Sequence, residues 1–228
     1  MNSDLLTQLW QAGVLQRGIV ETLAMTLLST LFAYLLGLPL GVLLTITGSG
    51  KQGLCENKPV NRTLGAAVNV VRSIPFLILM VALLGVARAI VGTAIGNKAV
   101  VVTLVIAAAP FVARMVESSL LEVDAGVIEA AQAMGASNLQ IICRVLLPEA
   151  LPSLLQGAVI STVTILGYSA MAGTVGGGGL GQIAIAYGHQ RSHKDVIWVC
   201  LVLIVLIVQL LQELGGFAAR RLDRRARH

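Results

Sequence analysis

Residues 22–47 read TLAMTLLSTLFAYLLGLPLGVLLTIT and contain no charged side chain. A helix needs about 20 consecutive apolar residues to cross the hydrocarbon core of a bilayer. The stretch is long enough for one complete crossing and predicts a membrane-spanning helix near the start of the chain. The expected class is therefore that of a helical membrane protein.

The composition of the whole chain agrees with this expectation. Of its 228 residues, 56% are hydrophobic and 12% are charged, whereas a soluble domain carries about 25% charged residues. This excludes an ordinary cytosolic domain and a disordered chain, and three cysteines are too few for a disulfide scaffold. The 24 glycines allow helices to approach closely in lipid, so we expect an all-α bundle packed on small side chains.

Charge-poor windows predict five transmembrane helices in all. They lie at about residues 22–47, 64–87, 99–116, 153–173 and 196–214. Pro75 is expected to bend the second span, and Arg72 either extends to the cytosolic headgroups or contacts a carboxylate or a partner span. Only one span fits between Glu149 and Arg191, because Gly176–Gly179 ends helical structure.

Lysine and arginine are distributed unequally between the two sides of these spans. If the C-terminus is cytosolic, nine of them lie inside: Lys51, Lys58, Arg62, Arg144, Arg220, Arg221, Arg224, Arg225 and Arg227. Five lie outside: Arg17, Arg88, Lys98, Arg191 and Lys194. The positive-inside rule therefore predicts a cytosolic C-terminus and, with five spans, an N-terminus outside. The net charge of +5 reflects a basic cytosolic tail at residues 215–228 that anchors the chain and meets anionic lipid; nucleic-acid binding is not expected.

The loop at residues 117–152 is too polar for lipid and too regular for a linker. Asp124 is placed to cap a first short helix, which Gly135 ends in the left-handed conformation. Ser137 and Gln140 form a capping box for a second helix at 138–147, which Pro148 is expected to terminate. Two short helices on the cytosolic face indicate a docking site for a protein partner.

The five spans show no internal repeat and cannot be divided into two equal halves. Transporters commonly place their pathway between two related halves. A pathway on a symmetry axis would therefore need a second copy of the chain, and a homodimer is the simplest arrangement.

The loop also carries a recognisable signature. The residues that form it are Glu129, Ala130, Ala131, Gly135, Val145, Leu147 and Pro148. They resemble the E-A-A, Gly, Ile-x-Leu-Pro signature of the membrane subunits of binding-protein-dependent ABC importers, with every spacing kept and Val145 in place of the usual Ile. The segments ETLAMT (21–26), RSIPF (72–76), APFVARMVE (109–117) and GYSAM (167–171) resemble the permeases of methionine-uptake importers in particular. Polar amino-acid permeases resemble it less, since they tend to carry R-G-T-P where this chain has RSIP at 72–75.

The resemblance extends over residues 17–211 and implies one type I ABC importer permease domain in a bacterial inner membrane. It implies a permease homodimer, two cytosolic ATPases and an extracytoplasmic binding (lipo)protein. In that setting Ala130 and Ala131 would keep one helix face low enough to enter a groove of an ATPase, while Glu129 would meet a donor there. Gly135 would set the angle between the two loop helices, and Pro148 would transmit movement to the fourth span.

The fourth span is where we expect the translocation pathway. Tyr168, Ser169 and Met171 combine an aromatic ring, a hydroxyl and an adaptable thioether within four residues. Two interpretations of Met171 stay open: it closes the pore and contacts substrate, or it simply packs between helices.

Other patterns are assigned no chemistry. Gly176–Gly181 has a GxGxxG spacing but lacks the strand and helix of a dinucleotide site, and we interpret it as a hinge on the outer side. Ser169 with His189 and His193 is typical of neither an intramembrane protease nor a zinc site, because both histidines fall in a polar connector. No G-x-x-x-x-G-K-[ST] motif occurs, so ATP and Mg²⁺ are expected on the partner ATPase.

The sequence thus predicts a non-enzymatic permease subunit that forms the homodimeric pathway of an ATP-driven methionine importer. A permease for another amino acid or small solute is the alternative, and an intramembrane serine protease and a channel-like secondary transporter are more remote ones.

Overall fold

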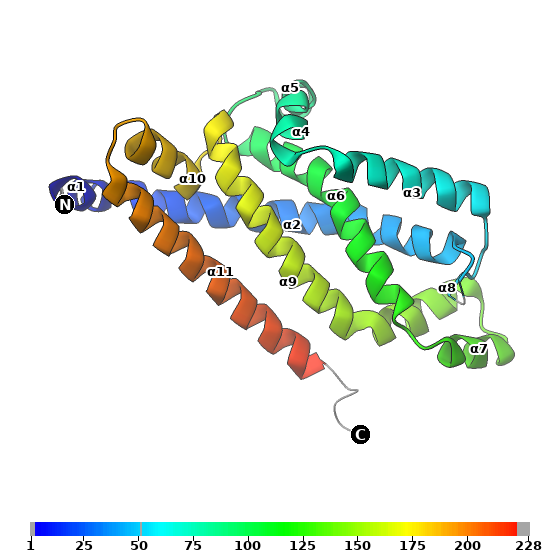
Figure 1. Cartoon of the computed structure of the whole chain (residues 1–228). Helices are drawn as coiled ribbons and strands as arrows, with labels where there is room; N and C mark the ends of the chain where they lie inside the picture. Colours follow the sequence, from blue (N-terminus) through cyan, green and yellow to red (C-terminus); the bar gives the residue numbers. More distant parts are fainter. Residues whose placement is uncertain (1–2, 51, 223–228) are drawn as a thin grey trace. The chain divides into compact units, whose positions relative to one another are not determined.

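The computed structural model describes residues 3–50 and 52–222, and every regular element within them is a helix (Figure 1). The α-helices are α1 (Ser3–Gln11), α2 (Val14–Thr47), α3 (Lys58–Ser73), α4 (Phe76–Ala82), α5 (Leu84–Val91), α6 (Asn97–Leu121), α7 (Ala125–Ala133), α8 (Asn138–Ile141), α9 (Leu147–Ala172), α10 (Gly179–Ile183) and α11 (Lys194–Leu222). Two π-helical segments, η1 (Ile142–Leu146) and η3 (Ala184–His189), and one 3₁₀ turn, η2 (Gly173–Val175), complete the list.

The helices form two compact units. Unit 1 contains the described residues up to Phe32 together with Ile74–Ala108 and Thr162–Gln212. Unit 2 contains Ala33–Ser73, Ala109–Ser161 and the described residues from Glu213 onward. The long helices α2, α6, α9 and α11 each contribute to both units.

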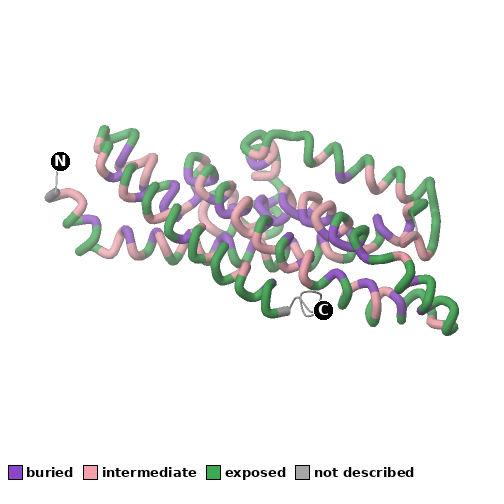
Figure 2. Tube along the Cα trace, turned by 60° about the horizontal axis from the view of Figure 1, so that its bottom comes forward, coloured by how far each residue is buried: buried purple, intermediate pink, exposed green. Residues whose placement is uncertain are grey.

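Unit 1 is held by an apolar core contributed by α1, α2, α9, α10 and α11. Its buried members are Leu9, Leu15, Leu166, Leu180, Ile183, Val196, Cys200 and Ile207. The short α10 lies against the start of α2, where the Leu180 amide donates to the Thr22 hydroxyl at 2.9 Å (Figure 1). Burial recurs at helical intervals along the chain, so each long helix alternates buried and exposed positions (Figure 2).

Unit 2 depends on a close approach of α2 to α6. Gly37 and Gly41 lie one helical turn apart on α2, and a Cβ at Gly41 would come within 2.6 Å of the Ala113 carbonyl oxygen. A Cβ at Gly37 would meet the Val112 side chain at 2.7 Å. This is the small-xxx-small packing that membrane helices use, because lipid supplies no hydrophobic force between helices. The expected packing on small side chains is therefore confirmed.

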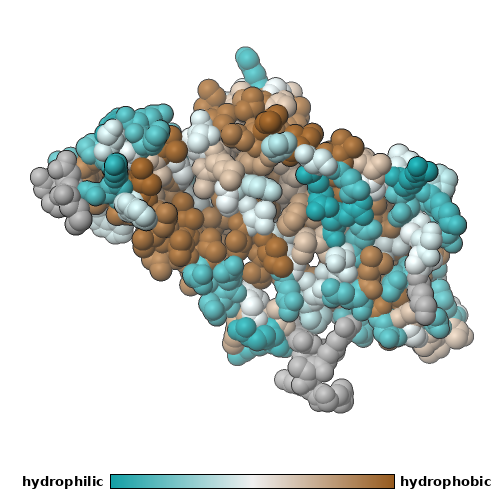
Figure 3. All heavy atoms as spheres, in the orientation of Figure 1, coloured by the Kyte–Doolittle hydropathy of each residue, from teal (hydrophilic) through white to brown (hydrophobic). Residues whose placement is uncertain are grey.

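The outer faces of the long helices are strongly apolar. Only 17% of the most apolar window of α11 is buried within the chain. Large apolar side chains such as Leu201, Val205 and Leu206 are exposed on this helix. Figure 3 shows apolar atoms gathered over the first part of α11. An exposed surface of this kind would be unstable in water and is typical of contact with lipid.

Four helical stretches in the described residues are long and apolar enough to cross a membrane. They are Val14–Thr47, Asn97–Leu121, Asn138–Val175 and Lys194–Arg221. A fifth exists if α3 and α4 form one broken span. Most of these helices extend beyond the predicted spans, because a helix keeps its internal hydrogen bonds when it leaves the bilayer.

The region predicted as the second span is interrupted rather than merely bent. α3 ends at Ser73, and Pro75, with ψ of 130°, precedes the first residue of α4. Proline disfavours the helical conformation of the residue before it, which explains the break at Ile74. Arg72 is exposed in the last turn of α3.

The end of the chain also differs from the expected tail. Helix α11 continues through residues 215–222, so Arg220 and Arg221 lie in its last turn, where cations are favoured. Arg224, Arg225 and Arg227 lie outside the described residues, as does Lys51.

Candidate functional site

The first short helix of the loop in unit 2 forms as predicted. The Asp124 carboxylate caps α7 by accepting a hydrogen bond from the Gly126 amide at 2.6 Å. At the other end Gly135 has φ of +78°, and the Ala136 amide donates to the Ala131 carbonyl at 3.1 Å. This is the Schellman ending that glycine favours, so the stop at Gly135 is confirmed.

The signature residues of α7 do not share one face. Val127, Ala130 and Met134 are exposed at i, i+3 and i+7, and Met134 is 81% exposed. Ala131 is only 4% exposed and lies inward with Ile128. Ala130 and Ala131, which we expected to shape one docking face, thus face outward and inward respectively, because neighbouring residues of a helix point about 100° apart; their contact with a partner stays a prediction.

Glu129 is exposed beside this outward row. Val127, Ala130 and Met134 form an apolar row, with the small side chain of Ala130 at its middle. We call these three residues the α7 docking row. An exposed apolar row on a short helix outside the spans is suited to insertion into a groove of another protein.

The second loop helix begins as predicted but does not end at Pro148. Ser137 and Gln140 form the capping box: the Ser137 amide donates to Gln140 Oε1 at 2.9 Å. α8 then continues through η1 into α9, where Pro148 is the second residue. The expected termination is wrong because the π segment widens the helix, with the Leu147 amide donating to the Ile142 carbonyl, and proline is tolerated beside such a bulge.

The remaining signature residues lie along this continuous helix. Val145 and Leu147 are half-buried, and Pro148 is exposed. Helix α7 and the residues predicted as the fourth span are thus linked by one helical path, interrupted only by the turn at Gly135.

The residues of α9 predicted to line the pathway, all in unit 1, divide between two faces. Met171 is 52% exposed, and the Tyr168 ring stacks on Phe76 with centroids 4.3 Å apart and planes 6° from parallel. Ser169 is 1% exposed and donates to the Leu166 carbonyl at 2.8 Å. Ser169 therefore belongs to the inner packing face of this chain, whereas Met171 and Tyr168 lie closer to the free face; the pathway role of the three residues stays a prediction.

The contacts of Ser169 also bear on the alternative that the chain is an intramembrane serine protease. Its other neighbour is the Thr26 hydroxyl, 3.5 Å away, and neither Thr26 nor a carbonyl can act as a general base. His189 follows α10 in η3 and His193 lies in the polar turn before α11. Among the described residues, no group of three metal-ligating side chains surrounds a possible ion site.

The glycine-rich segment of unit 1, which we interpreted as a hinge, forms a cap whose amides are bound by side chains of α2 and α6. The Gly178 amide donates to Asn97 Oδ1 at 2.8 Å, and the Gly179 amide donates to Glu21 Oε2 at 2.9 Å. A Cβ at Gly178 would lie 2.5 Å from Asn97 Oδ1. The glycines are needed because α2 and α6 approach the backbone closely here.

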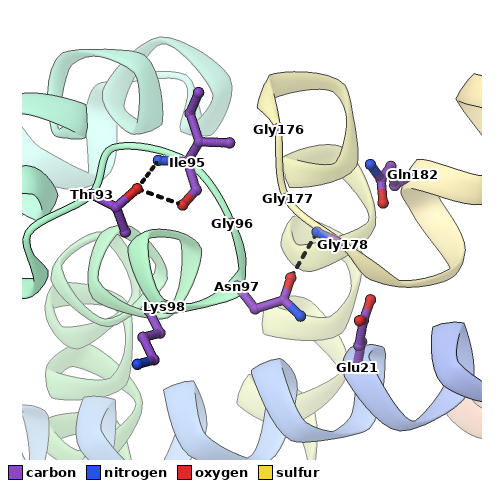
Figure 4. A pocket seen from close by; sticks show the side chains of 10 residues that line it. All are labelled: Glu21, Thr93, Ile95, Gly96, Asn97, Lys98, Gly176, Gly177, Gly178 and Gln182. Carbon is purple, nitrogen blue, oxygen red and sulfur yellow. Dashed lines mark hydrogen bonds between the residues drawn. The ribbon is translucent and has the colours of Figure 1, made fainter.

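A cavity of about 390 Å³ lies beside this cap. It is lined by Glu21, Thr93, Ile95, Gly96, Asn97, Lys98, Gly176, Gly177, Gly178 and Gln182. In Figure 4 the Asn97 amide points at the glycine backbone, whereas the Lys98 side chain points away from it. The sequence did not indicate Asn97, because its partner is a backbone amide far along the chain.

Known proteins match this chain over nearly its whole length. The family model for the binding-protein-dependent transport system inner membrane component matches residues 37–228. A probable D-methionine transport system permease protein, MetI of Vibrio cholerae, is 52% identical over 99% of this chain and 95% of its own. The methionine import system permease protein MetP of Bacillus subtilis is 46% identical over 96% of each chain.

A solved structure shares the fold. A chain from the inward-facing MetNI methionine ABC transporter is 48% identical and superimposes with a TM-score of 0.91, covering 97% of this chain and 100% of its own. Taken with the apolar helices, these likenesses establish that the chain belongs to the family of binding-protein-dependent transport system inner membrane components.

Proposed function

We propose that the chain is the permease subunit of an ATP-driven methionine importer. The observation that carries this proposal is the 52% identity, over 99% of the chain, to a D-methionine permease. The chain's part is transport and not catalysis: the hydrogen-bond contacts of Ser169 within the described residues are a hydroxyl and a carbonyl, neither of which is a base, and its apolar helices are suited to a bilayer.

In this proposal the chain crosses the membrane five times, with α3 and α4 together forming the second crossing. The N-terminus lies outside and the C-terminus lies in the cytosol. Lysine and arginine are in excess on the side of the membrane that would hold the C-terminus, which supports this orientation. The family resemblance supports an extracytoplasmic binding protein as the source of the substrate.

The α7 docking row would meet a cytosolic ATPase, which holds ATP and Mg²⁺. Ala130 is small enough for the row to enter a groove, and Glu129 offers a carboxylate at its edge. The path from α8 through η1 into α9 supports transmission of a push, because an unbroken helix deforms less than a loop. Reversal of a conformational equilibrium from 1:99 to 99:1 needs about 5.5 kcal/mol, which nucleotide-driven closure of the ATPases would supply.

The pathway would run along the free face of α9, between two copies of the chain. Met171 leaves half of its side chain unpacked within one copy, so a second copy or a substrate could contact it. A thioether adapts to apolar guests of irregular shape, which suits the side chain of methionine.

Uptake of radiolabelled methionine tests the proposal. The chain is reconstituted with its ATPase in liposomes, together with the binding protein, and uptake is measured with and without ATP. ATP-dependent uptake of methionine that excess unlabelled methionine suppresses is expected. Uptake of another amino acid in its place would assign a different substrate, and failure to co-purify with an ATPase would remove the importer assignment altogether.

A further inference from the structure

The segment that joins α2 to α3 in unit 2 is firmly attached to the end of α2. We call residues 48–50 and 52–57 the brace loop. The Cys55 amide donates to the Ile46 carbonyl at 2.9 Å, and the Asn57 amide donates to the Thr47 carbonyl at 3.0 Å. These bonds occupy carbonyls that a helix end leaves without amide partners, so the loop has a defined position at the end of α2.

One side chain of the brace loop reaches the segment just before α7. The Gln52 amide nitrogen donates to the Leu121 carbonyl at 3.2 Å and to the Val123 carbonyl at 3.0 Å. Leu121 is the last residue of α6, and Val123 directly precedes Asp124, the cap of α7. Gln52 therefore holds the joint at the start of α7.

A second contact holds the segment just after α7. Asn138, the first residue of α8, donates from its amide nitrogen to the Leu54 carbonyl at 3.3 Å and to Cys55 Sγ at 3.0 Å. Figure 1 shows the connection from α2 to α3 passing beside α8. Both joints that flank α7 are thus bound by the same loop.

The helix itself contributes two buried side chains to its placement. α7 has nine residues, and Ile128 and Ala131 are its buried side chains. A helix held at both flanking joints cannot tilt unless those hydrogen bonds break. The orientation of the α7 docking row consequently depends on contacts between residues 71 and 84 positions apart in the chain.

We propose that the brace loop sets the orientation in which α7 meets the ATPase, with Gln52 and Asn138 as positioning residues. This inference rests on the proposed function for the role of α7, although the bracing itself does not. It makes the end of the first span part of the coupling device, so that α2 and α7 move together.

The variants Gln52→Glu and Asn138→Asp test the bracing directly. Each keeps the size of the side chain but replaces the amide donor by an oxygen that repels the facing carbonyls. Gln52→Met removes the donor without adding charge. Gln190→Glu, at an exposed position in unit 1, makes the same chemical change without a brace contact and is the matched control.

Hydrogen–deuterium exchange of the full complex reports on α7. Amides in residues 125–136 should exchange about fivefold faster or more in the brace variants, because even a modest loss of interaction energy changes a local opening equilibrium by that factor. The rest of unit 2 and the Gln190→Glu control should exchange as in the wild type. Unchanged exchange of α7, or equally faster exchange throughout unit 2, would overturn the bracing.

Transport reports on coupling. In proteoliposomes the brace variants should assemble with the ATPase in wild-type amounts yet move about fivefold less methionine per ATP hydrolysed. A wild-type ratio of transport to hydrolysis in variants whose α7 exchanges faster would overturn the positioning role. If the wild-type complex itself moves no methionine, the proposed function fails, and the exchange measurement still decides whether the loop braces α7.

Discussion

Met171 carries the substrate hypothesis at the scale of a single residue. A buried methionine truncated to alanine costs about 2 to 5 kcal/mol of stability, but Met171 is half exposed within one chain. We therefore expect Met171→Ala to fold and assemble in normal amounts. If the side chain contacts substrate, the competition by selenomethionine relative to norleucine should change by about tenfold or more, since one methylene in a pocket alters discrimination to that extent.

Uptake per assembled complex is the appropriate measurement for this variant. Ser169→Ala is a useful comparison, because Ser169 lies on the opposite, buried face of α9 and should affect folded yield more than competitor ranking. Equal uptake and an unchanged ranking in Met171→Ala would leave this residue as a packing contact between copies.

Gly135 is the residue on which the turn after α7 depends. Its φ of +78° lies in the left-handed region, where a side chain costs about 1 to 2 kcal/mol. No atom stands within 4 Å of a Cβ placed there, so backbone geometry and not crowding makes glycine necessary. Gly135→Leu should detach the permease from its ATPase or uncouple the two.

Gly135→Asn separates these effects, because asparagine tolerates the left-handed conformation. Affinity co-purification of the ATPase and ATP-dependent uptake should survive in Gly135→Asn and be lost in Gly135→Leu. Normal transport by the leucine variant would mean that the turn has no part in coupling.

At the scale of elements, the contact of α2 with α6 rests on the absence of side chains. A Cβ at Gly41 would overlap the Ala113 carbonyl, so Gly41→Ala must separate the two helices. Overpacking of this kind costs about 1 to 3 kcal/mol. Thermal unfolding in mild detergent should show a clear decrease in midpoint.

Gly85→Ala is the matched control for this prediction. Gly85 lies in α5 with no atom within 4 Å of its ideal Cβ, and alanine is the better helix former. Its midpoint should therefore stay the same or increase. A Gly41→Ala midpoint equal to that of Gly85→Ala would show that the two helices do not depend on their close approach.

At the scale of the whole molecule, the orientation can be tested by labelling. In a background with Cys55 and Cys143 replaced by serine, single cysteines are placed at Gln190 and at Met134, which are both exposed. In cells that express the permease without its ATPase, so that the α7 docking row is uncovered, an impermeant thiol reagent added outside should label Gln190→Cys and should label Met134→Cys only after lysis, because the loop with α7 is placed in the cytosol. The reverse pattern would invert the topology.

The sequence alone was sufficient for features that depend on local chemistry. The charge-free stretch at 22–47 required a helix in lipid, and Asp124, Gly135, Ser137 and Gln140 determined where the loop helices begin and turn. These features follow from backbone hydrogen bonding within a few residues, so each could be read from neighbouring positions.

The tertiary structure decided which face of a helix each residue occupies and which residues distant in the chain it contacts. Ala130 and Ala131 fell on different faces of α7, as did Met171 and Ser169 on α9, which placed Ala131 and Ser169 inside. Pro148 continued a helix because a π bulge preceded it. The glycine segment became a cap because Glu21 and Asn97, remote in the chain, met its amides. Long-range contacts of this kind leave no local periodicity in the sequence, since each partner is specified only by the packing of other helices.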